Sequence, residues 1–100
     1  MARRSLATDH AAVHDFIQVW LFTCEHWGAD QADRYVDRLV AGSELLRAFP
    51  HLGKSRDELR EGYFSHQVEQ HILFYTFTSN EVRIRRVLHQ AMDLPSHLGD

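Results

Sequence analysis

The stretch HILFYTFTSNEVRIRRVLHQ, residues 71–90, decides how this chain folds. Its opening run, Ile72 to Tyr75, is apolar at consecutive positions, which is typical of a central strand buried on both faces. The half that follows Ser79-Asn80 alternates apolar residues with arginines, which indicates a strand with one buried face. The sequence therefore predicts two strands, at 71–78 and 81–88, joined by a tight turn.

The alternation in the second of these strands assigns its side chains to two faces. Arg86 falls among the apolar residues in this pattern, so its charge needs an acid, a carbonyl or an exit to water. The predicted faces are Val82, Ile84 and Leu88 on one side, and Arg83, Arg85, Val87 and His89 on the other.

Two helices are predicted upstream, because apolar residues recur there at steps of three and four. The first follows Thr8 or Asp9, either of which can cap it, and ends at Gly28. The second follows Asp30 as its cap and ends at Pro50. The short link implies an antiparallel hairpin. The predicted buried stripes are Val13, Phe16, Ile17, Trp20, Leu21 and Cys24 in the first helix, and Ala32, Tyr35, Val36, Leu39, Leu46 and Phe49 in the second.

The order of these elements predicts an α+β fold. A short N-terminal strand at 4–7 precedes the antiparallel helical hairpin, and a loop at 50–58 follows it. A strand at 63–68 then joins the two strands above in a three-stranded antiparallel sheet. We expect a single domain over residues 1–100, in which residues 90–100 form a C-terminal tail.

The charge balance restricts the classes of function. The 100 residues hold 14 acids against 11 bases, and Lys54 is the single lysine beside ten arginines. A net charge of −3 does not suit a protein that grips nucleic acid directly, because phosphate binding needs positive surface. The lone Cys24 and the lack of a long apolar run indicate a reducing, cytoplasmic location and no membrane insertion.

Several blocks of this sequence resemble the ParE family of bacterial toxins, within the RelE/ParE superfamily. The resemblance spans nearly the whole length. It rests on Trp27-Gly28 with Gln31-Ala32, on the 71–75 strand, and on the Val82 to Asp93 block that ends in RVLHQAMD. It implies two antiparallel helices packed on a small sheet, and a type II toxin that inhibits DNA gyrase by binding.

The resemblance also implies the partners. The first is a cognate ParD-like antitoxin, a ribbon-helix-helix DNA-binding dimer whose C-terminal segment folds onto the toxin and silences it. The second is DNA gyrase, so the protein would meet DNA only through gyrase or the antitoxin. No cofactor, metal or catalytic residue is expected. The apolar groove between hairpin and sheet is the predicted site for the antitoxin segment.

The superfamily leaves two other functions open. A RelE-like ribosome-dependent mRNA endonuclease could use Arg60, Arg85 and His89, but scarce lysine removes the cations usual in that branch. A module that binds its antitoxin without toxicity is the third possibility. The arginines could equally be solvated side chains paired with acids, and the tail could cover the sheet edge. The predicted contacts to gyrase or another partner are Arg60, Arg83, Arg85, His89, Met92 and Leu94.

Overall fold

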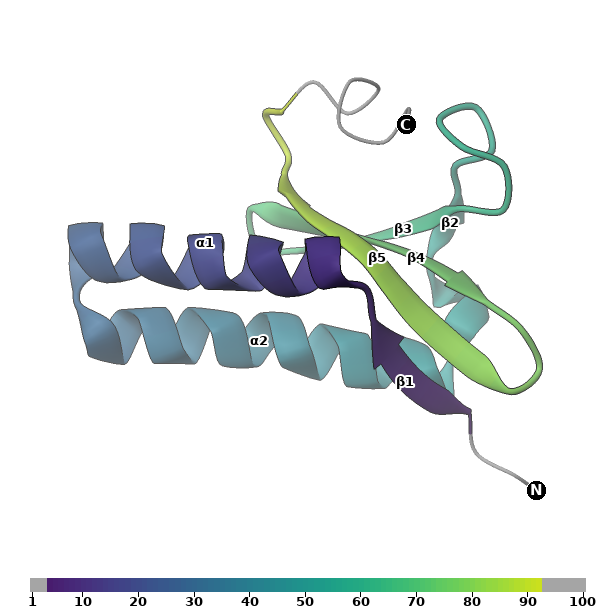
Figure 1. Ribbon diagram of the computed structural model, residues 1–100, viewed down its shortest axis with the longest axis horizontal. Helices are drawn as coiled ribbons and strands as arrows, with labels where there is room; N and C mark the ends of the chain where they lie inside the picture. The colour runs from purple at the N-terminus through teal and green to yellow at the C-terminus, as the bar shows by residue number, and fades with distance from the viewer. Residues whose placement is uncertain (1–3, 93–100) are drawn as a thin grey trace.

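The fold has two layers, a helical hairpin and a five-stranded sheet (Figure 1). The computed structural model describes residues 4–92. The hairpin consists of α1 (His10–Trp27) and α2 (Ala29–Ala48). The strand order in the sheet is β1-β5-β4-β3-β2, where only the pairing of β1 with β5 is parallel. The strands are β1 (Ser5–Thr8), β2 (Lys54–Ser55), β3 (Phe64–Val68), β4 (His71–Phe77) and β5 (Glu81–His89).

The predicted α+β class and the order of strand, hairpin and three antiparallel strands are confirmed. The structure adds two short elements inside the stretch predicted as a loop, the 3₁₀ turn η1 (Pro50–Leu52) and the edge strand β2. No helix within residues 4–92 combines the length and apolar character that crossing a membrane requires.

The helix ends differ from the prediction in two details. Gly28, with φ of +91°, is the only residue between α1 and α2, and such a backbone angle favours glycine. Asp30 therefore lies in the first turn of α2 and does not cap it. Asp9 does precede α1, but its side chain makes no capping hydrogen bond, since its carboxylate binds two arginines instead.

The buried face of α1 is not the predicted one. Nearly the whole circumference of α1 is apolar, so its periodicity could not select a side. The face turned to the sheet carries small residues that allow close approach, together with the buried Asp15. Val13, Ile17 and Leu21 of the predicted stripe are about half exposed. The observed buried residues are Ala12, Asp15, Val19 and Thr23, with Phe16 partly buried beside them.

A similar correction applies to the end of α2. Ala32, Leu39 and Leu46 are buried as predicted, but Phe49 is 62% exposed. Phe49 follows the last helical residue and has φ of −134°, so it no longer continues the helical face.

A β-bulge changes the faces of β5. Phe74 lies opposite Arg86 and Tyr75 lies opposite Ile84, so Arg85 is the extra residue. Beyond it the alternation shifts by one position. Val87 therefore joins the core below the helices, whereas Leu88 lies against the opposite face, and the predicted assignment of Arg86, Val87 and Leu88 is wrong.

The two faces of the sheet carry separate apolar clusters. The helix side buries Leu73, Tyr75 and Ile84 against the hairpin. On the other side, Phe74 and Leu88 pack with Tyr63 and Leu59 from the segment between β2 and β3. β4 is therefore buried on both faces, as its apolar run predicted.

A candidate partner-binding cavity

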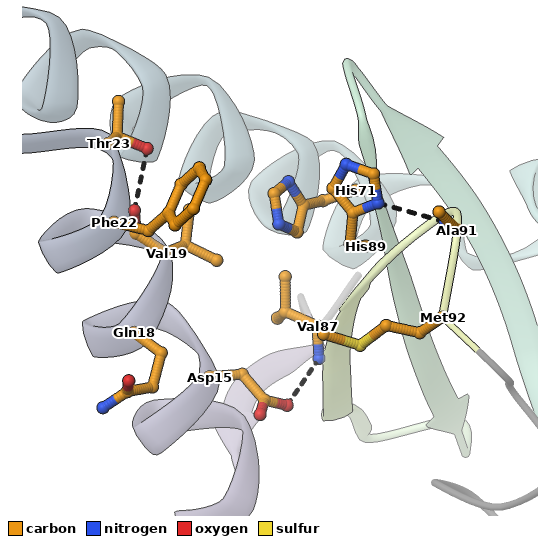
Figure 2. A pocket seen from close by; sticks show the side chains of 10 residues that line it. All are labelled: Asp15, Gln18, Val19, Phe22, Thr23, His71, Val87, His89, Ala91 and Met92. Atoms are coloured by element: carbon orange, nitrogen blue, oxygen red, sulfur yellow. Dashed lines mark hydrogen bonds between the residues drawn. The ribbon is translucent and has the colours of Figure 1, made fainter. Parts of the chain in front are cut away.

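A cavity of about 510 Å³ opens between α1 and the C-terminal end of β5 (Figure 2). Its volume lies in the range of small-ligand pockets and is large enough for side chains of a partner. Apolar groups form most of its wall. The lining comprises Asp15, Gln18, Val19, Phe22 and Thr23 from α1, His71 from β4, and Val87, His89, Ala91 and Met92 from β5 and the turn after it.

Asp15 closes one end of this cavity and is itself only 7% exposed. β1 pairs with β5 only as far as Ile84, so the edge of β5 beyond Ile84 needs another partner. Asp15 supplies it, because its Oδ2 accepts hydrogen bonds from the Val87 amide at 2.9 Å and from Arg86 Nε at 2.7 Å. The acid that the sequence required for Arg86 is therefore Asp15.

His71 lies in the cavity wall as a neutral imidazole. Burial and, to a smaller extent, the neighbouring His89 lower the pKa of His71 from 6.5 to about 4, against a smaller opposing effect of Asp15. The Tyr35 hydroxyl lies 2.7 Å from Nδ1 of His71 and accepts a hydrogen bond from the Gln70 amide at 3.1 Å. This network fixes the ring between α2 and β4.

His89 stands beside His71, with ring centroids 5.2 Å apart in an edge-to-face arrangement. The Ala91 amide donates to Nδ1 of His89 at 3.0 Å, so a neutral His89 carries its proton on Nε2. The two imidazoles thus add polar groups to an otherwise apolar wall. They suit recognition of a partner group that hydrogen-bonds as well as filling space.

The β5 arginines that the sequence singled out gather elsewhere, around Asp9. Arg83 Nη1 and Arg85 Nη1 lie 3.0 Å and 3.1 Å from the two carboxylate oxygens of Asp9. Arg83 also pairs with Glu81 at 2.9 Å. Burial alone would raise the pKa of Asp9, but its bonds to Arg83 and Arg85 hold the pKa below its ordinary value. This cluster ties β5 to the start of α1.

The structure therefore separates the predicted contact residues. His89 and Met92 meet at the cavity, whereas Arg83 and Arg85 surround Asp9. Arg60 lies in the segment between β2 and β3, with its guanidinium 5.5 Å from the centre of the Tyr63 ring. Leu94 falls outside the described residues.

Sequence reasoning missed several lining residues, notably Val19, Phe22 and Thr23, because the face of α1 was misassigned. One signal was available. Asp15 is the only acid among the first fifteen residues of α1, where a lone charge in an apolar helix suggests a specific partner. Within residues 4–92 there is no cluster of three His, Cys, Asp or Glu that could hold a metal ion.

Comparison with known proteins assigns the fold and then the family. A solved structure, a chromosomal ParDE toxin–antitoxin system from P. aeruginosa, shares the fold with a TM-score of 0.77 and 18% identity, over 87% of this chain and 96% of that one. Toxin ParE1 of Mycobacterium tuberculosis is 35% identical over 99 residues, which is 98% of this chain and 100% of the relative. Toxin ParE1 of Caulobacter vibrioides is 35% identical over 85 residues, 85% of this chain and 88% of the relative.

The solved structure thus defines the fold, and the two relatives define the class as that of the ParE toxins. The family model described as ParE toxin of type II toxin-antitoxin system, parDE, matches residues 7–94. The chain belongs to the ParE toxin family, as the sequence blocks indicated.

Proposed function

We propose that this protein is a cytoplasmic toxin that binds and inhibits DNA gyrase, without chemistry by its own side chains, and that a cognate antitoxin neutralises it. The observation that carries the proposal is the pairing of the β5 arginines. Arg83 and Arg85 share Asp9, and Arg86 is held by Asp15, at distances between 2.7 and 3.1 Å. Their charges are balanced inside the molecule.

This pairing argues against ribonuclease chemistry. Cleavage of RNA needs cations aimed at the developing charge of the phosphorane, and an acid and a base within reach of one phosphate. Arg85 donates hydrogen bonds to Asp9 and Thr76, whereas His89 lies at the cavity, so the two side chains do not face one common site. His71, the imidazole next to His89, stays neutral near pH 7 because its pKa is about 4, so it cannot serve as the protonated acid.

The cavity is the part of the surface that suits the antitoxin. A disordered segment that folds on binding must offset its own ordering cost, which requires substantial apolar contact. The mostly apolar wall between Val19, Phe22 and Val87 supplies such contact, and His89 at its edge supplies a polar group. An antitoxin segment that inserts a large apolar side chain here fits both features.

The test of gyrase inhibition is a supercoiling and DNA-cleavage assay with purified toxin and gyrase. We expect supercoiling to fall and gyrase-cleaved DNA to accumulate as the toxin is added, and premixing with antitoxin to abolish both effects. If folded toxin in clear excess leaves gyrase untouched, the proposal is wrong. Primer extension on translated mRNA covers the ribonuclease alternative, which predicts cleavage that is lost in His89→Ala.

The cavity is tested separately with antitoxin binding. Phe22 lies at its rim and is 57% exposed, so Phe22→Asp should fold normally and bind the antitoxin more weakly, by about tenfold or more. Leu45→Asp is the matched control, because Leu45 is an exposed apolar residue on α2 that does not line the cavity.

A further inference from the structure

His71 brings one polar atom without a partner into the mostly apolar cavity. Its Nδ1 lies 2.7 Å from the hydroxyl oxygen of Tyr35, a residue of α2 that does not line the cavity. The two nitrogens of an imidazole lie on different sides of the ring, so Nε2 is on the side away from Tyr35. Because His71 does line the cavity, that side faces its interior (Figure 2). Within residues 4–92, Nε2 of His71 has no hydrogen-bond partner.

A chain of hydrogen bonds determines which nitrogen of His71 carries the proton. The Tyr35 oxygen accepts the Gln70 amide at 3.1 Å, and its single hydroxyl proton needs an acceptor of its own. Among residues 4–92, Nδ1 of His71 is the only acceptor that this hydroxyl contacts. The hydroxyl therefore donates to Nδ1, and the neutral ring carries its proton on Nε2. Burial keeps the ring neutral at pH 7, because it lowers the pKa of His71 to about 4. His71 thus offers the cavity a hydrogen-bond donor.

The rest of the cavity wall disfavours a negatively charged ligand. Of the residues in 4–92 that line it, none is a lysine or an arginine. Asp15 closes one end, and both of its carboxylate oxygens bind Arg86, so the charges of this pair balance each other. A carboxylate that entered the cavity would lose its water without gaining a cation, and it would lie near a second carboxylate. The donor of His71 therefore suits an uncharged acceptor.

We propose that the cavity binds an apolar group that carries an uncharged carbonyl oxygen, and that Nε2 of His71 recognises this oxygen by donating a hydrogen bond to it. The inference rests on the proposed function, because it assigns the carbonyl to the main chain of the antitoxin segment that inserts an apolar side chain here. Every such residue brings a main-chain carbonyl with it, and a buried carbonyl that finds no donor lowers the affinity. His71 supplies that donor.

Tyr35 is a positioning residue in this arrangement. It does not line the cavity, so it acts on the ligand only through His71. Its hydroxyl keeps Nδ1 of His71 occupied as an acceptor, which holds the proton on Nε2. Without that hydroxyl nothing in this chain of hydrogen bonds selects one tautomer, so the ring would carry its proton on either nitrogen. Tyr35→Phe should therefore change the proton position of a residue that it leaves in place.

NMR of the ¹⁵N-labelled full chain tests the proton position before any ligand is added. Long-range proton–nitrogen correlations distinguish a ring nitrogen that carries a proton from one that does not. At pH 7 we expect His71 to be protonated on Nε2 in the parent, and to show both tautomers in Tyr35→Phe. A proton on Nδ1 of His71 in the parent would overturn the proposal, because the ring would then offer the cavity an acceptor.

Two small probes with the same branched apolar stem test the ligand chemistry. Methyl isoamyl ketone ends in an uncharged carbonyl, and isocaproate ends in a carboxylate. We expect the ketone to bind at least about fivefold more tightly at pH 7, followed by NMR titration. His71→Phe keeps an aromatic ring but removes the donor, so the ketone should bind about threefold or more weakly. His14→Phe, the same substitution at an exposed position outside the cavity, should leave its affinity unchanged. Equal affinity of the two probes, or undiminished ketone binding in a folded His71→Phe, would overturn the proposal.

Addition of the antitoxin separates this inference from the proposed function on which it rests. The probes report on the toxin alone, whether or not the antitoxin enters the cavity. Antitoxin added to the labelled toxin should shift the Nε2 signal of His71, as the ketone does. If Phe22→Asp weakens the antitoxin but the antitoxin leaves that signal unchanged, the cavity assignment stands and the carbonyl contact is wrong. If Phe22→Asp leaves antitoxin binding intact, the antitoxin lies elsewhere and both assignments are wrong.

Discussion

Asp15 on α1 receives the guanidinium of Arg86 on β5 through two hydrogen bonds, 2.7 Å from Nε to Oδ2 and 3.0 Å from Nη2 to Oδ1. The same carboxylate accepts the Val87 amide, so one side chain closes the strand edge that β1 leaves open. Bidentate Arg–carboxylate pairs have a fixed geometry. This pair therefore sets which face of the apolar helix α1 is turned to the sheet.

Asp15→Asn should destabilise the protein by about 2–4 kcal/mol. An asparagine keeps the volume but offers one acceptor instead of two, and it leaves the Arg86 charge uncompensated in a partly buried position. Urea unfolding at pH 7 measures the change in the free energy of unfolding. Asp37→Asn is the control, since Asp37 is exposed, and it should change that free energy by less than about 0.5 kcal/mol. Equal effects of the two substitutions would contradict the role of Asp15.

The strands and the hairpin could be predicted because their signals are local. The apolar run of β4, the alternation of β5 and the glycine at position 28 each act within a few residues. The buried face of α1 could not be predicted, because the helix carries apolar residues of its own on nearly every side. What decides it is the contact of Asp15 with Arg86, 71 positions later.

The candidate site was only half predictable for the same reason. His89 and Met92 lie in the motif that marked the family, and both reach the cavity. The bulge at Arg85 depends on how β5 pairs with β4, and it reverses the faces of the residues that follow. Arginines that looked like partner contacts, Arg83 and Arg85, are held instead by Asp9.

Acidification should lower the folding stability of the protein, because of His71. Because the pKa of His71 is lowered from 6.5 to about 4 on folding, the unfolded chain binds a proton in this interval and the folded chain does not. The stability from the neutral ring is complete above pH 6.5 and is lost as pH falls from 6.5 to 4. We expect the free energy of unfolding to fall by about 1–2 kcal/mol. This value is smaller than the pKa change alone would give, because solvent screens part of the ring.

Unfolding by urea at pH 7 and at pH 5, in the parent and in His71→Asn, checks this dependence. The variant should lose less stability than the parent on acidification. His14→Asn, which changes an exposed histidine of α1, should behave as the parent does. If the two variants and the parent share one pH dependence, His71 does not contribute to it.

Gly53→Ala should lower the free energy of unfolding more than Gly62→Ala does. Gly53 has an ordinary backbone angle, but a Cβ atom there would meet the hydroxyl of Tyr75 and lie 2.7 Å from the Ser65 carbonyl oxygen. The Tyr75 hydroxyl also donates to the Pro50 carbonyl and accepts from the Gly53 amide, so it cannot give way freely. We expect a loss of about 2–3 kcal/mol.

Gly62 provides the contrast for that prediction. A Cβ at Gly62 would meet nothing within 4 Å, but the residue has φ of +81°, so its cost is confined to backbone strain. That strain is about 1 kcal/mol. Thermal or urea unfolding of both variants measures the order, and a smaller effect at Gly53 than at Gly62 would show that the contact with Tyr75 relaxes.

Thr23→Leu should stabilise the folded toxin and weaken the binding of its antitoxin. Thr23 lines the cavity, and its hydroxyl only donates back to the Val19 carbonyl of the same helix at 2.8 Å. A leucine there replaces this polar group and buries additional apolar area against the cavity wall, which favours folding by about 1 kcal/mol. The same side chain would fill space that the proposed antitoxin contact uses. Urea unfolding should therefore show a higher free energy of unfolding. Calorimetric titration should show an affinity for the antitoxin that is lower by about tenfold or more. A variant that is more stable and binds the antitoxin as tightly as the parent would show that the antitoxin does not enter the cavity.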